Sequence, residues 1–207
     1  MQTTVVSHPL VAERLTRLRD ATTPSHRFRA DLADLASFLI YEAARSLETD
    51  AVTVRSPLAD APGAVLSRPP LIVPVLRAGL GMLGAAQTLL PDAPVGFIGV
   101  RRNETTLLPA AYMSTVPADL GRRSVLVLDP MLATGGSLVY TCEQLVEHRA
   151  GRLVVVCVLA APEGLERVAD AGFDIEVWTA SIDERLNEVG FILPGLGDAG
   201  DRQFGIG

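Results

Sequence analysis

Lysine is absent from this chain, in which all 18 basic residues are arginine. A Walker-type P-loop needs a lysine beside its phosphates, and Schiff-base enzymes, including those that use pyridoxal phosphate, need one as nucleophile. The sequence therefore excludes these kinds of site. Any phosphate that the protein binds must be held by arginine, by hydroxyl groups or by main-chain N–H groups.

Cysteine and positive charge are also scarce. Cys142 and Cys157 lie among apolar residues without metal-site spacing, so we expect buried, reduced thiols. The net charge of −6 gives no general attraction to nucleic acid or to an anionic membrane. The N-terminal residues carry charges where a signal peptide needs an apolar core, and no stretch has the length and apolarity of a membrane span. We expect a cytoplasmic protein.

The pattern of apolar residues predicts one α/β domain, residues 1 to 207. Short β-branched runs, each typical of a strand buried on both faces, occupy residues 71 to 76, 95 to 100, 124 to 129, 152 to 160 and 174 to 180. Helical patterns occupy residues 79 to 90, 137 to 148 and 162 to 172, and a longer amphipathic one, with Ser25 as its expected N-cap, occupies residues 25 to 48. This alternation predicts a central parallel sheet flanked by helices.

Residues 101 to 123, "RRNETTLLPAAYMSTVPADLGRR", are polar, contain prolines and are too long for an ordinary connection. Long excursions of this kind are often lids. We therefore expect a flexible arm here. Because ligands of parallel sheets collect at the carboxyl ends of the strands, the segments that follow each strand are the candidate sites.

The segment after residue 76, "RAGLGMLGAA", contains Gly79, Gly81 and Gly84 in the G-x-G-x-x-G spacing of dinucleotide-binding folds. An NADP-dependent oxidoreductase is one reading. A single match of this motif is weak, and close helix packing is a better explanation for Gly81 and Gly84. Arg77 directly follows a buried strand, where a charge is rarely needed for packing, so we expect it to bind an anion.

The segment after residue 129, "PMLATGGS", has a stronger pattern. Thr134, Gly135, Gly136 and Ser137 lead into a helix, so that main-chain N–H groups and two hydroxyls can converge on a phosphate. Asp129 would repel that phosphate, and its carboxylate suits sugar hydroxyls or a magnesium shell instead. The alternative is an ordinary capped helix with Asp129 as a turn residue. The two kinds of group together predict a site for a phosphorylated sugar.

The motif "DPMLATGGS" resembles the phosphoribosyl-diphosphate (PRPP) loop of type I phosphoribosyltransferases, in the form typical of the uracil phosphoribosyltransferase family. Several further segments are similar to the same family. They are "HPLV" (8 to 11), "RFR" (27 to 29), "VPVLRAGLGM" (74 to 82), "RRNETT" (101 to 106), "APEGL" (161 to 165), "TASID" (179 to 183) and "LNEVGFILPGLGDAGDRQFG" (186 to 205). The resemblance covers essentially the whole chain.

This resemblance implies the type I phosphoribosyltransferase fold, with an arm or lid at residues 101 to 123 and a base-binding segment at residues 186 to 207. The implied reaction is the transfer of phosphoribose from PRPP to uracil, giving UMP and diphosphate in pyrimidine salvage. Mg²⁺ would be bound mainly through PRPP and not in a cage of protein ligands. A cis peptide bond between Leu76 and Arg77 is also implied.

The resemblance also assigns site residues. The implied PRPP ligands are Arg77, Arg102, Asp129, Pro130, Met131, Leu132, Ala133, Thr134, Gly135, Gly136, Ser137 and Asp198. The implied uracil contacts are Ile192, Gly197, Asp198 and Ala199, in a stretch that we expect to be irregular and to read the base with main-chain groups. Arg102, Asp129 and Asp198 would act in catalysis by positioning and by stabilising charge, without a covalent nucleophile.

A second function remains open, that of a regulatory protein of the same fold that senses UMP and binds RNA. The acidic net charge argues against it, because RNA binding needs a basic face. The resemblance further implies a homo-oligomer, a dimer or larger, and permits GTP as an effector.

Overall fold

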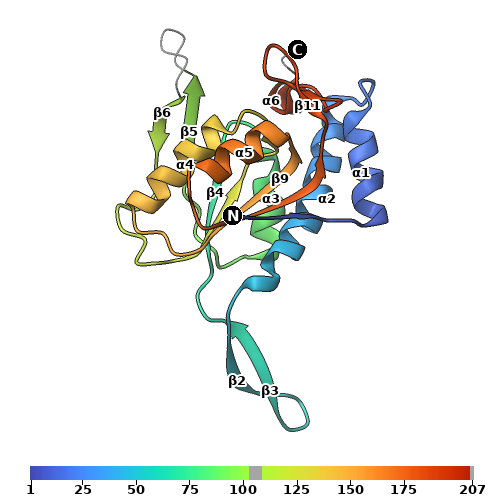
Figure 1. Cartoon of the computed structure of the whole chain (residues 1–207). Coiled ribbons are helices and arrows are strands. Elements are labelled where there is room, and N and C mark those ends of the chain that lie inside the picture. Colours follow the sequence, from blue (N-terminus) through green and yellow to red (C-terminus); the bar gives the residue numbers. More distant parts are fainter. Residues whose placement is uncertain (103–108, 206–207) are drawn as a thin grey trace.

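The structure, a computed structural model, describes residues 1 to 102 and 109 to 205, and for residues 101, 102 and 109 to 111 it describes the backbone alone. Its centre is a sheet whose strands run parallel, apart from β6 at one edge (Figure 1). The strand order is β1 (Gln2–Val5), β10 (Ile175–Ile182), β9 (Leu153–Ala160), β7 (Val125–Leu128), β4 (Leu71–Leu76), β5 (Ile98–Arg102) and β6 (Pro109–Ser114), and β8 (Met131–Leu132) pairs with β9.

The apolar runs form strands, as the sequence predicts. Every residue of β7 and β9 is buried, which is why these strands need continuous apolar sequence. The run from residue 95 to 100 is the exception. Its strand begins only at Ile98 and continues to Arg102, while Val95 makes an isolated bridge to Ile72. The polar strand β1, which the sequence pattern did not predict, extends the sheet beyond β10.

Helices cover both faces of the sheet, so the core has two layers of side chains. On one face lie α1 (Pro9–Arg19), α2 (Ser25–Ala43) and α3 (Leu80–Leu89), and on the other α4 (Gly136–Glu147) and α5 (Pro162–Asp170). A short 3₁₀ helix, η1 (Ala44–Ser46), continues α2. Alternate residues of β4, β7 and β9 point into the two layers, as expected for a sheet covered on both faces.

The expected N-cap of α2 is wrong. Ser25 is the first helical residue, and Pro24 occupies the N-cap position without a side-chain hydrogen bond. The extended backbone of Pro24, with φ −71° and ψ 154°, gives the chain the entry conformation that an N-cap needs. A proline can therefore end the preceding turn here without a capping side chain.

Both thiols are buried, as predicted. Loss of hydration raises the pKa of Cys142 and that of Cys157 to about 12, so both stay protonated at neutral pH. Among the described residues, no helix is long and apolar enough to cross a membrane.

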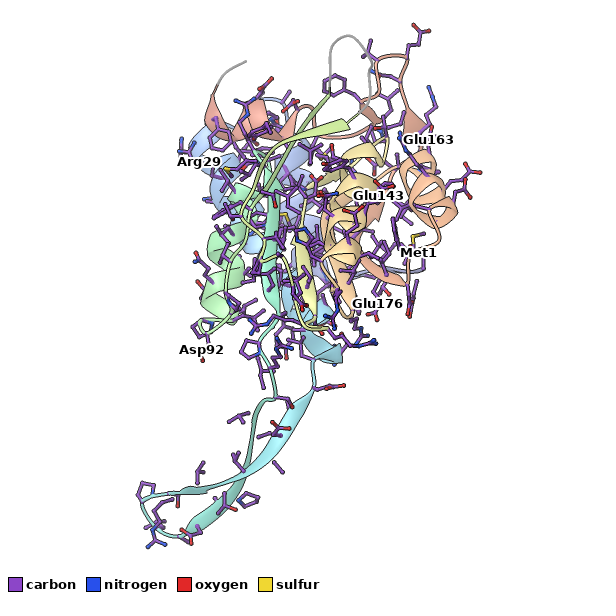
Figure 2. All side chains as sticks on the ribbon, turned by 90° about the vertical axis from the view of Figure 1, so that its left-hand side faces the viewer. Met1, Arg29, Asp92, Glu143, Glu163 and Glu176 are labelled. Carbon is purple, nitrogen blue, oxygen red and sulfur yellow. The ribbon has the colours of Figure 1, made fainter. Side chains whose placement is uncertain are left out.

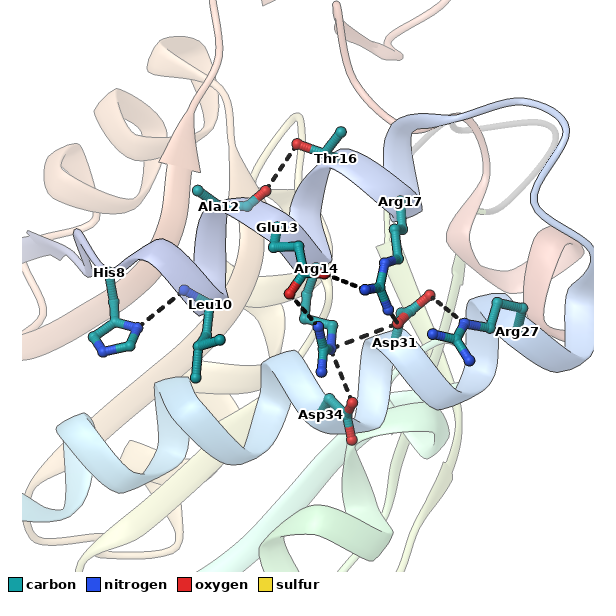
Figure 3. A network of polar contacts seen from close by, with 10 residues as sticks. All are labelled: His8, Leu10, Ala12, Glu13, Arg14, Thr16, Arg17, Arg27, Asp31 and Asp34. Atoms are coloured by element: carbon teal, nitrogen blue, oxygen red, sulfur yellow. Dashed lines mark hydrogen bonds and ion pairs between the residues drawn. The ribbon is translucent and has the colours of Figure 1, made fainter.

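A buried carboxylate links α1 to α2. The side chain of Asp31 is 1% exposed and is surrounded by three arginines, as Figure 3 shows. Arg17 Nη1 and Arg27 Nε donate to its two oxygens over 3.1 and 3.2 Å, and Arg14 Nε lies 3.6 Å away. The three positive charges compensate the buried negative charge, which would otherwise be strongly destabilising.

A two-stranded antiparallel hairpin, β2 (Thr49–Arg55) and β3 (Asp60–Leu66), projects from the body (Figures 1 and 2). It exposes apolar side chains, including Leu58 at 93% and Val54 at 50%. The sequence pattern did not predict it, because its residues bury no face within the chain.

Candidate active site

The strands β4 and β7 are neighbours in the sheet, but the chain leaves them in opposite directions. From β4 it continues to β5 on one side, and from β7 to β9 and β10 on the other. Such a reversal opens a crevice at the carboxyl ends of the two strands, where ligands of open α/β sheets bind. Arg77 directly follows β4 and Asp129 directly follows β7, so the structure brings these two predicted ligands to the same crevice.

The predicted phosphate cradle is a hollow of about 110 Å³ between β7 and α4. Gly135, with φ +75°, is the N-cap of α4 and makes no side-chain capping bond. The first hydrogen bond of the helix runs from Val139 N–H to Gly135 O, over 2.9 Å. The main-chain N–H groups that precede Val139 have no partner within the helix and, together with the positive end of the helix dipole, suit an anion. The hollow is lined by Asp129 and by Met131, Leu132, Ala133, Thr134, Gly135, Gly136, Ser137 and Leu138, so of the predicted loop residues only Pro130 does not line it.

Gly164 of α5 explains why the cradle loop lies where it does. A Cβ atom on Gly164 would collide with the carbonyl oxygen of Ala133, and one on Gly135 would lie 2.8 Å from the carbonyl oxygen of Gly164. The loop and the first turn of α5 therefore touch backbone to backbone. Glycine at both positions is required for that approach.

Burial dominates the electrostatics of Asp129. Loss of hydration raises the pKa of its carboxyl group to about 7, against a weak opposing hydrogen bond from Met131 N–H at 3.4 Å. A hydrogen bond from the N–H two residues ahead is what an aspartate with a purely structural role in a turn would accept. At 3.4 Å, however, this bond is too long to assign that role to Asp129. Among the described residues, no arginine forms an ion pair with Asp129. The carboxylate is thus placed to gain from a ligand that supplies hydroxyl groups or a cation.

The loop after β4 contains the non-proline cis peptide bond between Leu76 and Arg77 that the resemblance implied. Gly81 is needed for packing, as predicted, because its Cβ would collide with Gln203 of α6. Gly84 is different, since nothing lies within 4 Å of its Cβ position, and the packing explanation for it is wrong. Gly84 is on the exposed side of α3, where no neighbouring element approaches.

A second cavity, of about 310 Å³, adjoins the cradle. Its walls come from the cradle loop and from the C-terminal segment, and include the predicted uracil contacts Ile192, Gly197, Asp198 and Ala199. Met131, Ala133 and Thr134 line both cavities, so the two are adjacent. The volume falls within the range of about 300 to 1,000 Å³ that is common for small-molecule sites.

The C-terminal segment is more regular than predicted. The short strand β12 (Ile192–Leu193) pairs with β11 (Arg185–Leu186), and α6 (Ala199–Phe204) begins where we expected irregular chain. The prediction therefore holds only between the two elements, where Gly195 and Gly197 have φ of +65° and +79°.

Two charged residues of this segment have structural contacts. Asp198 is the N-cap of α6, and its Oδ1 accepts the N–H of Asp201 over 2.9 Å, although its exposed side chain also lines the cavity. The side chain of Arg202 donates to the carbonyl oxygens of Leu18, Asp20 and Leu196, and it does not pair with Asp201 within the described part of the chain. Arg202 thus fastens the segment to the end of α1.

Arg102 ends β5, with Pro109 as its partner in β6. Its backbone therefore lies at the carboxyl edge of the sheet, while its side chain is outside the described residues. Of the expected arm, residues 101 and 102 end β5 and residues 109 to 114 form β6, while residues 103 to 108 lie outside the described residues.

Sequence reasoning missed several residues that the fold brings to the two cavities. Ala78, Val189, Gly190, Phe191 and Gly200 line the larger one. Arg167 of α5 lies beside the cradle, with Nη1 3.5 Å from Thr134 O and 3.4 Å from the Cβ position of Gly136. Its place on an ordinary exposed helix gives no signal in the sequence, because only the close contact of α5 with the cradle brings it there.

Comparison with known proteins agrees with this geometry. A sequence model of the family described as uracil phosphoribosyltransferase matches residues 5–206. The chain is 52% identical over 208 residues to a uracil phosphoribosyltransferase of Streptomyces griseus, covering 99% of both chains, and 47% identical over 205 residues to that of Corynebacterium diphtheriae, covering 99% of this chain and 97% of the other.

Solved structures give the same result for the fold. A protein from Aquifex aeolicus superposes with a TM-score of 0.93 at 37% identity, over 99% of both chains. A hypoxanthine phosphoribosyltransferase of Staphylococcus aureus shares the fold alone, with a TM-score of 0.50 at 16% identity over 75% of this chain and 76% of the other. With the crevice, the cradle and these relatives together, the chain belongs to the uracil phosphoribosyltransferase family.

Proposed function

We propose that the protein transfers the 5-phosphoribosyl group of PRPP to uracil, with PRPP in the crevice between β4 and β7 and uracil in the cavity beside the C-terminal segment. The observation that carries this assignment is the wall that the two cavities share at Met131, Ala133 and Thr134. A ligand with its phosphate in the cradle has its other end at the second cavity. Phosphate, ribose and base follow one another in UMP in the same order.

Each group of PRPP has a candidate partner in this arrangement. The main-chain N–H groups and hydroxyls of residues 131 to 137 hold the 5′-phosphate, and Asp129 accepts hydrogen bonds from the ribose hydroxyls. Arg77 binds the diphosphate from the end of β4, and Arg102 approaches it from the hairpin of β5 and β6. Asp198 meets the ribose or the magnesium shell with the oxygen that does not cap α6.

The reaction needs positioning and charge stabilisation more than a reactive side chain. Diphosphate leaves C1 of the ribose as N1 of uracil bonds to that carbon and releases its proton, so positive charge develops on the ring and negative charge on the leaving group. Asp129 stabilises the first charge through the hydroxyl groups, and Arg77 and Arg102 stabilise the second. Holding both substrates in line removes much of the entropic barrier.

Magnesium fits this site as a companion of PRPP. The described residues contain no group of three or more His, Cys, Asp or Glu side chains that could hold a metal ion. The half-buried carboxylate of Asp129 is the hard oxygen ligand that Mg²⁺ prefers, and phosphate oxygens can supply the other ligands. When bound, Mg²⁺ offsets the negative charge of the diphosphate.

Main-chain groups of the C-terminal segment read the base. Uracil presents an acceptor at O4 beside a donor at N3, and cytosine reverses both. Each buried mismatch costs about 1 to 3 kcal/mol, so two mismatches give a discrimination of several hundredfold. Initial rates of UMP formation from uracil, and of CMP formation from cytosine, test this directly. A kcat/KM for cytosine within tenfold of the value for uracil would contradict the assignment.

Arg102 also has a direct test. If it binds diphosphate from a closing lid, Arg102→Ala lowers kcat/KM for PRPP by at least tenfold and leaves uracil binding to the PRPP-free enzyme unchanged. An Arg102→Ala variant with the kcat/KM of the original protein would remove this residue from the mechanism.

We further propose a cytoplasmic homo-oligomer that responds to GTP. The projecting hairpin of β2 and β3, with Val54 and Leu58 exposed, supports association of copies, since an isolated hairpin is only marginally stable.

A separate cavity of about 540 Å³ at the amino ends of β7, β9 and β10 suits the phosphates of GTP. Four arginines line it, Arg68, Arg122, Arg123 and Arg152, together with three acids, Glu48, Asp174 and Glu176. Arg152 pairs with Glu176, so Arg68, Arg122 and Arg123 are the arginines left for the phosphates. Light scattering tests the first point, and loss of the GTP effect on the rate in Arg123→Glu tests the second.

A further inference from the structure

Two side chains from distant parts of the chain hold the turn between β12 and α6. The N–H of Gly195 donates to Asp183 Oδ2 over 2.9 Å, and the carbonyl oxygen of Gly195 accepts from Arg19 Nη1 over 2.8 Å. Asp183 directly follows β10, and Arg19 is the last residue of α1. Neither side chain lines the cavity of about 310 Å³ that is proposed to hold uracil, called the base cavity below. Both side chains therefore contact the turn on the side that faces away from this cavity.

The carboxylate of Asp183 is fully engaged. Arg19 donates to both of its oxygens, over 2.6 and 2.7 Å, and Ser181 Oγ donates to Oδ1 over 2.9 Å. Each oxygen therefore accepts two hydrogen bonds. The Asp183 side chain is only 2% exposed. Burial alone would raise its pKa, but the bonds from Arg19, Gly195 and Ser181 lower it below the ordinary value, so the group stays ionised at neutral pH.

The turn itself allows little adjustment. Gly195 has φ +65°, and a Cβ atom there would collide with the carbonyl oxygen of Ile192. Ile192 lines the base cavity on one side of the turn, and the residues from Gly197 to Ala199 line it on the other. The position of Gly195 therefore sets how the main-chain groups on either side of it face the cavity.

We propose that Asp183 and Arg19 are positioning residues for base recognition, which hold Gly195 so that the main chain from Ile192 to Ala199 presents its N–H and C=O groups to uracil. The inference rests on the proposed role of that segment in reading the base. Asp183 and Arg19 would thus determine the specificity for uracil without contacting uracil or PRPP.

The decisive variant is Asp183→Asn. An asparagine keeps the size of the side chain but replaces one oxygen by an NH₂ group. That group faces a donor of Arg19 in either orientation, and in one of them also the N–H of Gly195, so the double bond from Arg19 that fixes the side chain is lost. We expect KM for uracil to rise at least tenfold and the uracil-to-cytosine ratio of kcat/KM to fall at least tenfold. KM for PRPP should change less than KM for uracil, because the cradle and the loop after β4 do not contact this pair and Asp198 is the one proposed PRPP ligand in the segment that it holds.

Asp31→Asn is the matched control. Asp31 is an equally buried carboxylate on α2, and its described partners are Arg14, Arg17 and Arg27, none of which bonds to Gly195 (Figure 3). Both variants should lower Tm, since both leave arginines without a buried partner. Only Asp183→Asn should change KM for uracil and the base discrimination.

Arg19→Lys gives a second measurement that does not depend on the fold of Asp183→Asn. Lysine keeps the charge but lacks the planar fork with which Arg19 reaches both oxygens and Gly195 O, so KM for uracil should rise three- to tenfold, with a smaller change in KM for PRPP. The proposal is overturned if both Asp183→Asn and Arg19→Lys keep the KM for uracil within twofold, or if Asp31→Asn shows the same loss of discrimination. A wild-type protein that does not discriminate uracil from cytosine would instead refute the reading of the base by the main chain.

Discussion

The carboxyl group of Asp129 should make the stability of the ligand-free protein depend on pH. Its pKa is about 7 in the folded state and 3.8 in the reference state. Between these values the folded protein holds a proton that the unfolded chain has lost. The unfolded chain therefore binds fewer protons, and stability falls as pH rises through this window.

The size of the effect follows from the shift. Each pKa unit corresponds to about 1.4 kcal/mol, so the full shift of about three units destabilises the folded state by at most about 4 kcal/mol above pH 7, and by less to the extent that the half-buried carboxyl group keeps its hydration. Between pH 5 and pH 8 the expected change is at most about 3 kcal/mol. Asp129→Asn cannot ionise and keeps the acceptor for Met131 N–H, so its stability relative to the original protein should rise by that amount over this range.

Urea unfolding of both proteins at pH 5 and pH 8 measures the difference, and taking the difference cancels the titration of all other groups. Asp183→Asn is a control of opposite sign. The pKa of Asp183 is lowered, so its contribution is complete above pH 4 and is lost only as pH falls below its reference value. The difference between Asp183→Asn and the original protein should be constant between pH 5 and 8. An equally constant difference for Asp129→Asn would refute the reasoning.

The glycines give two further predictions. Gly81→Ala should lower Tm and raise KM for uracil severalfold, because the added Cβ atom displaces Gln203. Gly84→Ala on the same helix should instead raise the free energy of unfolding by up to about 1 kcal/mol, because alanine has the higher helix propensity. Differential scanning calorimetry measures both changes in stability. Gly164→Ala should raise KM for PRPP at least tenfold and leave KM for uracil nearly unchanged. The reason is that the added Cβ atom collides with the carbonyl oxygen of Ala133 in the cradle. An unchanged KM for PRPP would mean that the cradle loop can move away at no cost in binding.

The carboxyl ends of the strands could be predicted because burial on both faces forces a continuous apolar run. The run before Asp129 ends where β7 ends, and the run before Arg77 ends with β4, so the place of both residues at the crevice followed from the sequence pattern, while their role as ligands stays a prediction. The cradle followed in the same way, since a cluster of hydroxyl residues and glycines at the start of a helix is typical of an anion site.

Contacts between distant segments could not be predicted. Arg19 and Asp183 are 164 residues apart, and no local pattern connects them. The hairpin of β2 and β3 was missed because nothing in the chain covers it, so its residues show neither the run of a buried strand nor a clear alternation. Ser25 was chosen as an N-cap from residue type, while the backbone of Pro24 decides where α2 begins.

The two cavities differ in when the chain can complete them during synthesis. The cradle needs β7, α4 and the first turn of α5, all of which precede residue 171, whereas the base cavity also needs residues 189 to 200 and their attachment to α1 through Arg202. At the usual rate of about 5 to 20 residues per second, the last of these segments leaves the ribosome seconds after the cradle residues. A nascent chain therefore completes the cradle before it completes the second cavity.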